Sequence, residues 1–338
     1  MASLVGLLSK AFDRGERMRL AAMGLGVAGL HVAGWGGLLL YGQGRPALLA
    51  LGALAYTFGL RHAFDVDHIA AIDNVTRKLL HEGERPMGVG FFFSLGHASV
   101  VFGLAAAVGA GVKWAVDNVV VGGHLRSVGG VIGTLVSGGF LLGIGVLNLI
   151  VLMEVWRGRR QGAEVGVGTG LMTRVFGRWL RWVKASWQMY AVGFLFGLGF
   201  DTASEVGLLA VAGGAAAKGL ALGTVLCLPV VFAAGMTLMD TADGAFMAKA
   251  YSWAGTSGQR KAFYNLLMTG LSAGAALVVG GMEVAQAAVS VLGLKGGAAK
   301  VIANFSLTGW AGYVLVGMFL AAWVGALVIY KAKRMEAA

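Results

Sequence analysis

The chain has 338 residues, of which 57% are hydrophobic and only 13% are charged. Soluble domains carry about 25% charged residues, so this composition excludes a soluble protein and fits several membrane spans of about 20 residues each. The net charge is +11, but the basic residues lie between apolar segments, which indicates membrane topology rather than nucleic-acid binding. A single cysteine, Cys227, excludes an internal disulfide and a thiolate metal cluster.

Residues 1–19 form a basic leader without the pattern of a cleavable signal peptide, and we expect this leader to lie on the cytoplasmic face. Eight apolar segments follow, each long enough to cross a bilayer as a helix. They predict an all-α polytopic membrane protein with spans at 20–41, 47–76, 87–112, 127–153, 185–212, 219–247, 261–282 and 308–331. The stretch 284–307 is Gly-rich and only partly apolar, so it is either a re-entrant segment or a surface segment.

Basic residues are distributed unevenly between the two sides of the predicted membrane. With the N-terminus inside, the inner segments contain 20 of the 27 Lys and Arg residues and the outer segments contain six. Positively charged loops favour the cytoplasmic side, so this asymmetry predicts that both termini are cytoplasmic. We therefore expect one transmembrane domain over 20–331, with its main cytoplasmic loop at 154–184 and a cytoplasmic tail at 332–338.

The second predicted span contains the most unusual stretch of the chain, LRHAFDVDHIAAIDN at residues 60–74. Charged side chains are costly inside a bilayer, so such a cluster indicates a functional site. Imidazole and carboxylate groups without thiolates are the ligands that suit a divalent first-row metal ion. The spacing His62-x4-Asp67-His68 therefore predicts a metal site in this span.

Helical geometry allows only part of this cluster to face one point. His62, Asp65 and His68 follow one another at steps of about 60° around a helix, whereas Asp67 points almost opposite to Asp65. Either the helix unwinds locally, as helices of transporter binding sites often do, or one aspartate serves another partner. Arg61 is a candidate charge partner for Asp65 or for an aspartate of the second half of the chain, because an unpaired charge in the membrane is expensive.

Two more residues near this cluster are ambiguous. Asp73, close to the cytoplasmic end of the same span, either belongs to the cluster or is a solvated or capping group. His97 lies in the middle of the third span, and it is either a metal ligand or a hydrogen-bonded core histidine whose ring Ser94 and Ser99 could orient.

The second half of the chain carries a weaker copy of these motifs. The segment 58–72 resembles 196–210, and FFSLGHASV at 92–100 resembles VFAAGMTLM at 231–239. The expected topology makes the two copies inverted repeats, an arrangement common in secondary transporters. The second half also contains four acidic residues within or near spans, Asp201, Glu205, Asp240 and Asp243. Either they add to an excess of negative charge that favours binding of a cation, or they tie helices together in a polar network.

At these positions the chain resembles the nickel/cobalt transporter family (NiCoT). The matching motifs are RHAFDVDHI at 61–69, SLGHASVV at 94–101, LGFDTASE at 198–205 and GMTLMDTADG at 235–244. The resemblance implies eight spans and a plasma-membrane permease that takes up Ni²⁺ and/or Co²⁺ as its substrate and needs no cofactor. It also implies a metal path through His62, Asp67, His68 and His97, supported by Asp201, Glu205, Asp240 and Asp243.

Three other interpretations remain open. Related permeases export metal, so the direction of transport is less certain than the substrate. An intramembrane metalloenzyme would need an open coordination position and a substrate cleft, for which no loop is long enough, so we expect no enzyme. A membrane subunit or sensor would bind metal without moving it. The sequence gives neither the Ni²⁺ to Co²⁺ preference, the coupling ion nor the oligomeric state.

Overall fold

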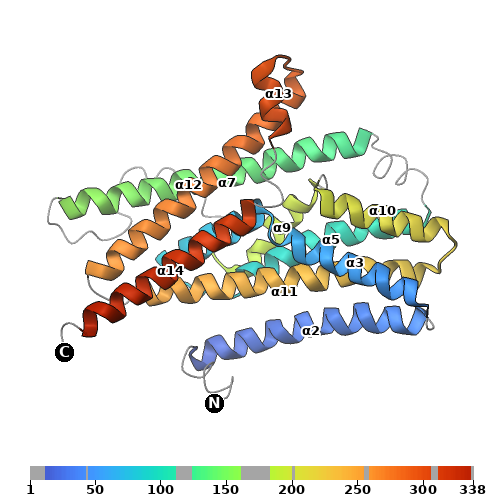
Figure 1. The fold of residues 1–338 in the computed structure, drawn as a ribbon, viewed down its shortest axis with the longest axis horizontal. Helices are drawn as coiled ribbons and strands as arrows, with labels where there is room; N and C mark the ends of the chain where they lie inside the picture. The colour runs from blue at the N-terminus through green and yellow to red at the C-terminus, as the bar shows by residue number, and fades with distance from the viewer. Residues whose placement is uncertain are drawn as a thin grey trace. The chain divides into compact units, whose positions relative to one another are not determined.

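The computed structural model describes residues 12–42, 45–111, 124–160, 183–199, 202–254, 259–305 and 311–335. Every regular element in these ranges is helical, as the sequence predicts (Figure 1). The elements are α2 (Arg14–Gly42), α3 (Pro46–His62), α4 (Val66–His81), α5 (Val89–Gly109), α7 (His124–Arg160), the 3-10 turn η2 (Ser186–Gln188), α9 (Met189–Gly197), α10 (Ala203–Ala217), α11 (Leu222–Ala254), α12 (Gln259–Leu292), α13 (Gly297–Asn304) and α14 (Ala311–Met335).

Each of the eight predicted spans corresponds to one or more of these helices. Five helices in the described part of the chain are long and apolar enough to cross a membrane, and a sixth crossing results if α3 and α4 count as one broken span. Two shorter apolar helices, Ala203–Ala217 and Ala311–Ala322, lie where the fifth and eighth spans are predicted. The fold is therefore an all-α polytopic membrane protein, and the count of eight stays a prediction.

Burial in this fold is the reverse of burial in a soluble protein. Large apolar side chains such as Leu25, Val32 and Leu40 of α2 are more than 70% exposed, whereas histidine, aspartate and glutamate side chains are buried between helices. Lipid accommodates exposed apolar groups at no cost, but polar groups must be satisfied inside the protein. The polar interior is therefore the place to look for function.

The chain separates into two compact units, each assembled from three segments. Unit 1 comprises 1–63, 86–133 and 186–245, and unit 2 comprises 64–85, 134–185 and 246–338. Unit 1 therefore contains α2, α3, α5, α9, α10 and most of α11, whereas unit 2 contains α4, most of α7 and α12 to α14. The boundary after Ala63 falls inside the helix that the sequence predicts over 47–76.

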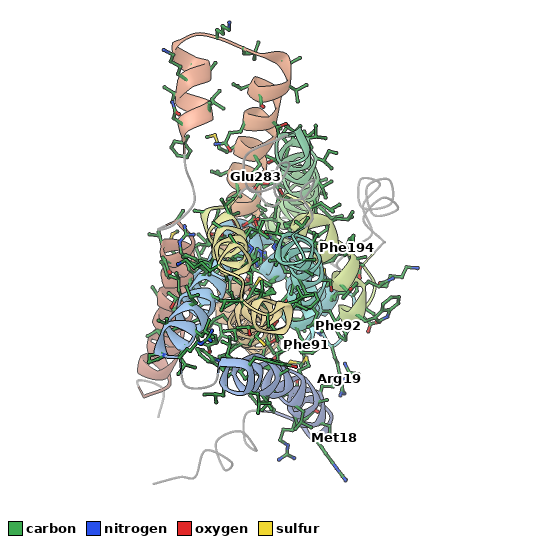
Figure 2. The ribbon with its side chains drawn as sticks, turned by 90° about the vertical axis from the view of Figure 1, so that its right-hand side faces the viewer. Met18, Arg19, Phe91, Phe92, Phe194 and Glu283 are labelled. Atoms are coloured by element: carbon green, nitrogen blue, oxygen red, sulfur yellow. The ribbon has the colours of Figure 1, made fainter. Side chains whose placement is uncertain are left out.

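In unit 1, small residues allow helices to pack backbone against backbone, as they do in many membrane proteins. A Cβ on Gly59 of α3 would overlap the carbonyl oxygen of Phe232 on α11, and a Cβ on Gly235 of α11 would meet the carbonyl oxygen of Tyr56 on α3. These two glycines therefore hold α3 and α11 in close contact. Elsewhere α2 approaches α5 through Gly26, which faces the ring of Phe91 (Figure 2).

The same pair of approaches recurs between α9 and α5. A Cβ on Gly193 of α9 would overlap the carbonyl oxygen of Phe93 on α5, and a Cβ on Gly96 of α5 would overlap the carbonyl oxygen of Tyr190 on α9. The packing thus relates α3 to α9 and α5 to α11, which supports an internal repeat. In this packing Gly193 occupies the position in the second copy that Gly59 occupies in the first. Sequence similarity instead aligns Gly59 with Gly197, one helical turn further along the chain.

In unit 2, polar contacts and a tight turn fix the helices. Ser137 of α7 donates a 2.6 Å hydrogen bond to Glu283 of α12, which Figure 2 labels. In the stretch 284–307, expected to be either re-entrant or on the surface, α12 continues to Leu292 and α13 then turns back against α12. Gln286 of α12 donates hydrogen bonds to the carbonyl oxygens of Ile302 and Phe305, which fasten this return.

We predict that Gly96→Ala lowers the thermal unfolding midpoint of the purified protein, because the added methyl group would meet backbone atoms of α9. Overpacking of this kind costs about 1–3 kcal/mol. Gly103→Ala on the same helix is the matched control, because nothing lies within 4 Å of its Cβ position. Equal unfolding midpoints for the two variants in detergent would show that the α5–α9 approach is not tight.

Candidate metal centre

Two interrupted helices position the side chains of the candidate site. The predicted second span breaks after His62, where α3 ends. Asp65 has an extended backbone and is the N-cap residue of α4, which begins at Val66. The predicted fifth span breaks in the same way, since α9 ends at Gly197 and α10 begins at Ala203. Local unwinding was one of two alternatives for the second span, and it is the one observed. Such discontinuous helices bring both side chains and helix ends to a binding site.

Three ligand atoms meet where these breaks and the middle of α5 come together in unit 1. The Nε2 atoms of His62 and His97 are 2.9 Å apart, and Nε2 of His97 is 2.8 Å from Oε1 of Glu205. The third distance, from His62 Nε2 to Glu205 Oε1, is 3.8 Å. All three side chains are buried, with at most 3% of any of them exposed. We call these residues the His62–His97–Glu205 cluster.

The spacing within this cluster matches that of ligands around a metal ion. With metal–ligand bonds of about 2.0–2.1 Å, two ligand atoms at right angles lie about 3 Å apart. Two imidazoles and one carboxylate on one side of an ion leave other coordination positions open, and this ligand set suits first-row divalent ions. The cluster can therefore bind such an ion with small adjustments of its side chains.

The hydrogen-bonding groups of the cluster also favour a cation. A ring nitrogen of neutral histidine is either a donor or an acceptor, and an ionised carboxylate only accepts. His97 Nε2 faces both His62 Nε2 and Glu205 Oε1, so a single N–H of His97 has to serve both contacts. A divalent ion in place of that proton would satisfy three lone pairs at once.

Hydroxyl groups and an arginine surround the cluster. Thr202 donates a 2.7 Å hydrogen bond to Oε2 of Glu205, and its oxygen is 3.4 Å from Nδ1 of His62. Ser204 Oγ is 3.2 Å from the same Nδ1 and accepts a hydrogen bond from Arg61. Thr202 and Ser204 therefore contact Nδ1 of His62, and Thr202 contacts Oε2 of Glu205. These atoms are not the ones that converge in the cluster, which are Nε2 and Oε1.

The two serines expected to orient His97 form hydrogen bonds elsewhere. Ser94 donates to Thr237 of α11 at 3.0 Å, and Ser99 donates to the carbonyl oxygen of Leu95 at 2.8 Å. The physical reason is that both serines lie on α5 itself, where a hydroxyl easily reaches a neighbouring helix or the preceding turn.

Of the residues predicted in the second span, Arg61 and His62 lie on α3 in unit 1, and the aspartates and His68 lie on or next to α4 in unit 2. His68 and Asp65 are buried, and Asp67 is half-buried. Asp240 of α11 is buried and Asp243 is half-buried. Asp201 lies outside the described residues. Sequence reasoning gave Glu205 only a supporting role and did not single out Thr202 and Ser204, although all three stand together in the DTASE motif.

Asp73 was expected to be a solvated or capping group if it did not belong to the metal cluster, and it is neither solvated nor exposed. Arg77 pairs with it at 2.8 Å, Tyr251 donates to it at 2.5 Å and Ser272 donates to its other oxygen. The Arg77 guanidinium also lies 5.1 Å from the centre of the Tyr251 ring. Because the carboxylate and guanidinium balance each other's charge, this group ties α4 to α11 and α12 in unit 2.

A family model described as high-affinity nickel-transport protein matches residues 48–329. The chain is 47% identical over 309 residues to the nickel transporter NicT of Mycobacterium tuberculosis, covering 86% of this chain and 82% of that protein. It is 48% identical over 277 residues to the nickel transporter NixA of Staphylococcus aureus, covering 79% and 81%. It is 43% identical over 290 residues to the cobalt transport protein NhlF of Rhodococcus rhodochrous, covering 81% and 82%. No solved structure matches.

We predict that Asp73→Asn destabilises the protein strongly, because it leaves the Arg77 charge buried without its carboxylate. Breaking a buried ion pair costs about 3–5 kcal/mol. Tyr251→Phe removes a neutral hydroxyl that contacts Asp73 and Ser272 and keeps the ion pair, so it should cost less, about 0.6–1.7 kcal/mol. Thermal unfolding of the purified variants measures both effects. A smaller loss for Asp73→Asn than for Tyr251→Phe would contradict the assignment of Asp73 and Arg77 as a buried ion pair.

Proposed function

Because the chain belongs to the high-affinity nickel-transport protein family, we propose that it carries Ni²⁺ and/or Co²⁺ into the cytoplasm through the His62–His97–Glu205 cluster. The observation that carries this proposal is the approach of two imidazole nitrogens and one carboxylate oxygen to a common point in a buried, membrane-embedded position. Relatives named for nickel and for cobalt transport agree with a ligand set that both ions accept. The ion is the substrate, and no resident cofactor is part of the proposal.

In the proposed mechanism the hydrated ion enters from the outer side of the membrane. It exchanges water for Nε2 of His62, Nε2 of His97 and Oε1 of Glu205, which compensate for its lost hydration. The carboxylate neutralises part of its charge, while the imidazoles provide the softer donors that favour Ni²⁺ and Co²⁺ over Mg²⁺ and Ca²⁺. Alternating access of the protein then releases the ion to the cytoplasmic side.

We further propose that His68 and Asp67 belong to the same metal path. His68 follows His62 by only six residues, and both side chains carry an imidazole that suits the same ion. The break between α3 and α4 frees these side chains from the angular spacing of one continuous helix. Asp65 is assigned either as a further ligand or as a charge partner of Arg61, and Asp201, Asp240 and Asp243 support the path.

The proposed setting is the plasma membrane, with several spans and both termini in the cytoplasm. The asymmetric distribution of Lys and Arg supports this orientation. Transport, rather than catalysis at the same ion, is supported by membership in a transporter family. A domain organisation with a basic leader, one membrane domain over 20–331 and a short tail is consistent with this proposal.

The proposal is tested with purified protein in liposomes that contain a metal-sensitive dye. External Ni²⁺ should enter liposomes with the wild-type protein, and His62→Ala, His97→Ala and Glu205→Gln should each abolish entry. His31→Ala is the control, because His31 contacts the Val27 carbonyl and Tyr56 instead of the cluster. Normal entry with all three cluster variants would disprove the proposed site. Metal depletion in cells that express the protein would instead identify an exporter.

We predict that Ni²⁺ affinity falls when the pH on both sides of the membrane is lowered from about 7.5 to about 5.5, across the ordinary pKa range of imidazole. Protons and metal compete for the same ring nitrogens, so binding of the ion has to displace protons. Calorimetric titration of the protein in buffers of different ionisation enthalpy counts the protons released. An affinity that is constant over this range, with no proton release, would argue against imidazole ligands.

A further inference from the structure

The first turn of α10 has the sequence of a capping box but not its hydrogen bonds. In this motif a threonine at the N-cap accepts from the backbone N–H three residues later, and a glutamate at that third position reaches back. Thr202 is the N-cap of α10 and Glu205 occupies the third position. The side chain of Thr202 nevertheless makes no capping hydrogen bond. The hydroxyl that would stabilise the helix end is used for other contacts.

Those contacts determine which nitrogen of His62 carries its proton. A threonine hydroxyl has one hydrogen, and Thr202 donates it to Oε2 of Glu205. Towards Nδ1 of His62 the Thr202 oxygen can therefore only accept, so this contact favours the tautomer with the proton on Nδ1. Ser204 also accepts from Arg61 and retains a lone pair for the same Nδ1–H. With the proton on Nδ1, the lone pair of His62 lies on Nε2 and points to His97 and Glu205.

We propose that Thr202 and Ser204 are positioning residues of the metal site, which hold His62 in its metal-binding tautomer and aim the Glu205 carboxylate. This inference rests on the proposed function, since it concerns the same cluster. Histidine ligands of metal ions commonly donate their second N–H to a neighbouring group, which fixes the tautomer and the ring orientation. Here one threonine hydroxyl serves two ligands at once, because it accepts from His62 and donates to Glu205.

The competing interpretation is that Thr202 simply stabilises the beginning of α10. The two interpretations differ for Thr202→Val, which removes the hydroxyl and keeps the shape of the side chain. A capping role predicts lower stability of the metal-free protein and unchanged metal affinity. A positioning role predicts weaker metal binding as well, because the hydroxyl that aims Glu205 is lost, and the loss of the Thr202–Glu205 hydrogen bond lowers metal-free stability in either case.

The experiment measures Ni²⁺ dissociation constants and metal-free unfolding midpoints for the full-length protein in nanodiscs. We also record visible absorption spectra with Co²⁺, which report the ligand geometry. Thr202→Val and Ser204→Ala should weaken Ni²⁺ binding by about 10- to 100-fold and shift the Co²⁺ bands. Thr202→Ser, which keeps the hydroxyl, should restore both. Ser99→Ala is the matched control, because this half-buried hydroxyl contacts Leu95 and Tyr190 instead of the cluster.

Unchanged Ni²⁺ affinity in both hydroxyl-free variants would overturn the inference. An unshifted Co²⁺ spectrum would also overturn it, even if affinity and unfolding midpoint fell together, because the ligand geometry would then be independent of the hydroxyls. His62→Ala separates this failure from a failure of the proposed function. If His62→Ala binds Ni²⁺ as the wild type does, the site itself is wrong. If His62→Ala loses binding while Thr202→Val and Ser204→Ala retain it, only the positioning role is wrong.

Discussion

The arrangement of this protein depends on three electron-pair donors that face one another in the buried interior. Nitrogen atoms of His62 and His97 and an oxygen of Glu205 lie within 3.8 Å of one another and are buried. Unpaired polar groups are costly in a membrane, so such a convergence needs either a shared proton or a cation. The surrounding structure holds these atoms together, and in the proposed function a metal ion takes the place of the shared proton.

Broken helices make this convergence possible. A continuous helix at bilayer depth satisfies its own backbone and spaces its side chains at fixed angles, which prevents neighbouring ligands from facing one point. The interruptions after His62 and before α10 free the chain at two places from this fixed helical spacing. The repeat-like packing of α3 on α11 and of α9 on α5 then brings His62, His97 and Glu205 together in unit 1. Glycine is required at these crossings because any side chain would meet a neighbouring backbone.

Much of the fold and part of the site could be predicted from the sequence. Hydrophobic runs located the helices, and the cost of charge in lipid drew attention to His62, while His97 was open between a metal ligand and a core histidine. Spacing alone could not show that Glu205 reaches the same point as these histidines, because that depends on how α10 crosses α5. The repeat was recognised, but similarity aligned it one turn away from the packing, since the second FGL contains Gly197, whereas the glycine that admits a neighbouring backbone as Gly59 does is Gly193. Asp73 was ambiguous because burial by α11 and α12 cannot be read from its own helix.

The central claim is most directly tested by X-ray absorption of Ni²⁺ bound to the full-length protein. The account predicts a first shell of nitrogen and oxygen at about 2.0–2.1 Å, with the outer scattering of at least two imidazole rings. His97→Ala should remove one ring from that signal and leave a weaker site. A spectrum of the wild-type protein that contains sulfur ligands, or no imidazole scattering, would contradict it.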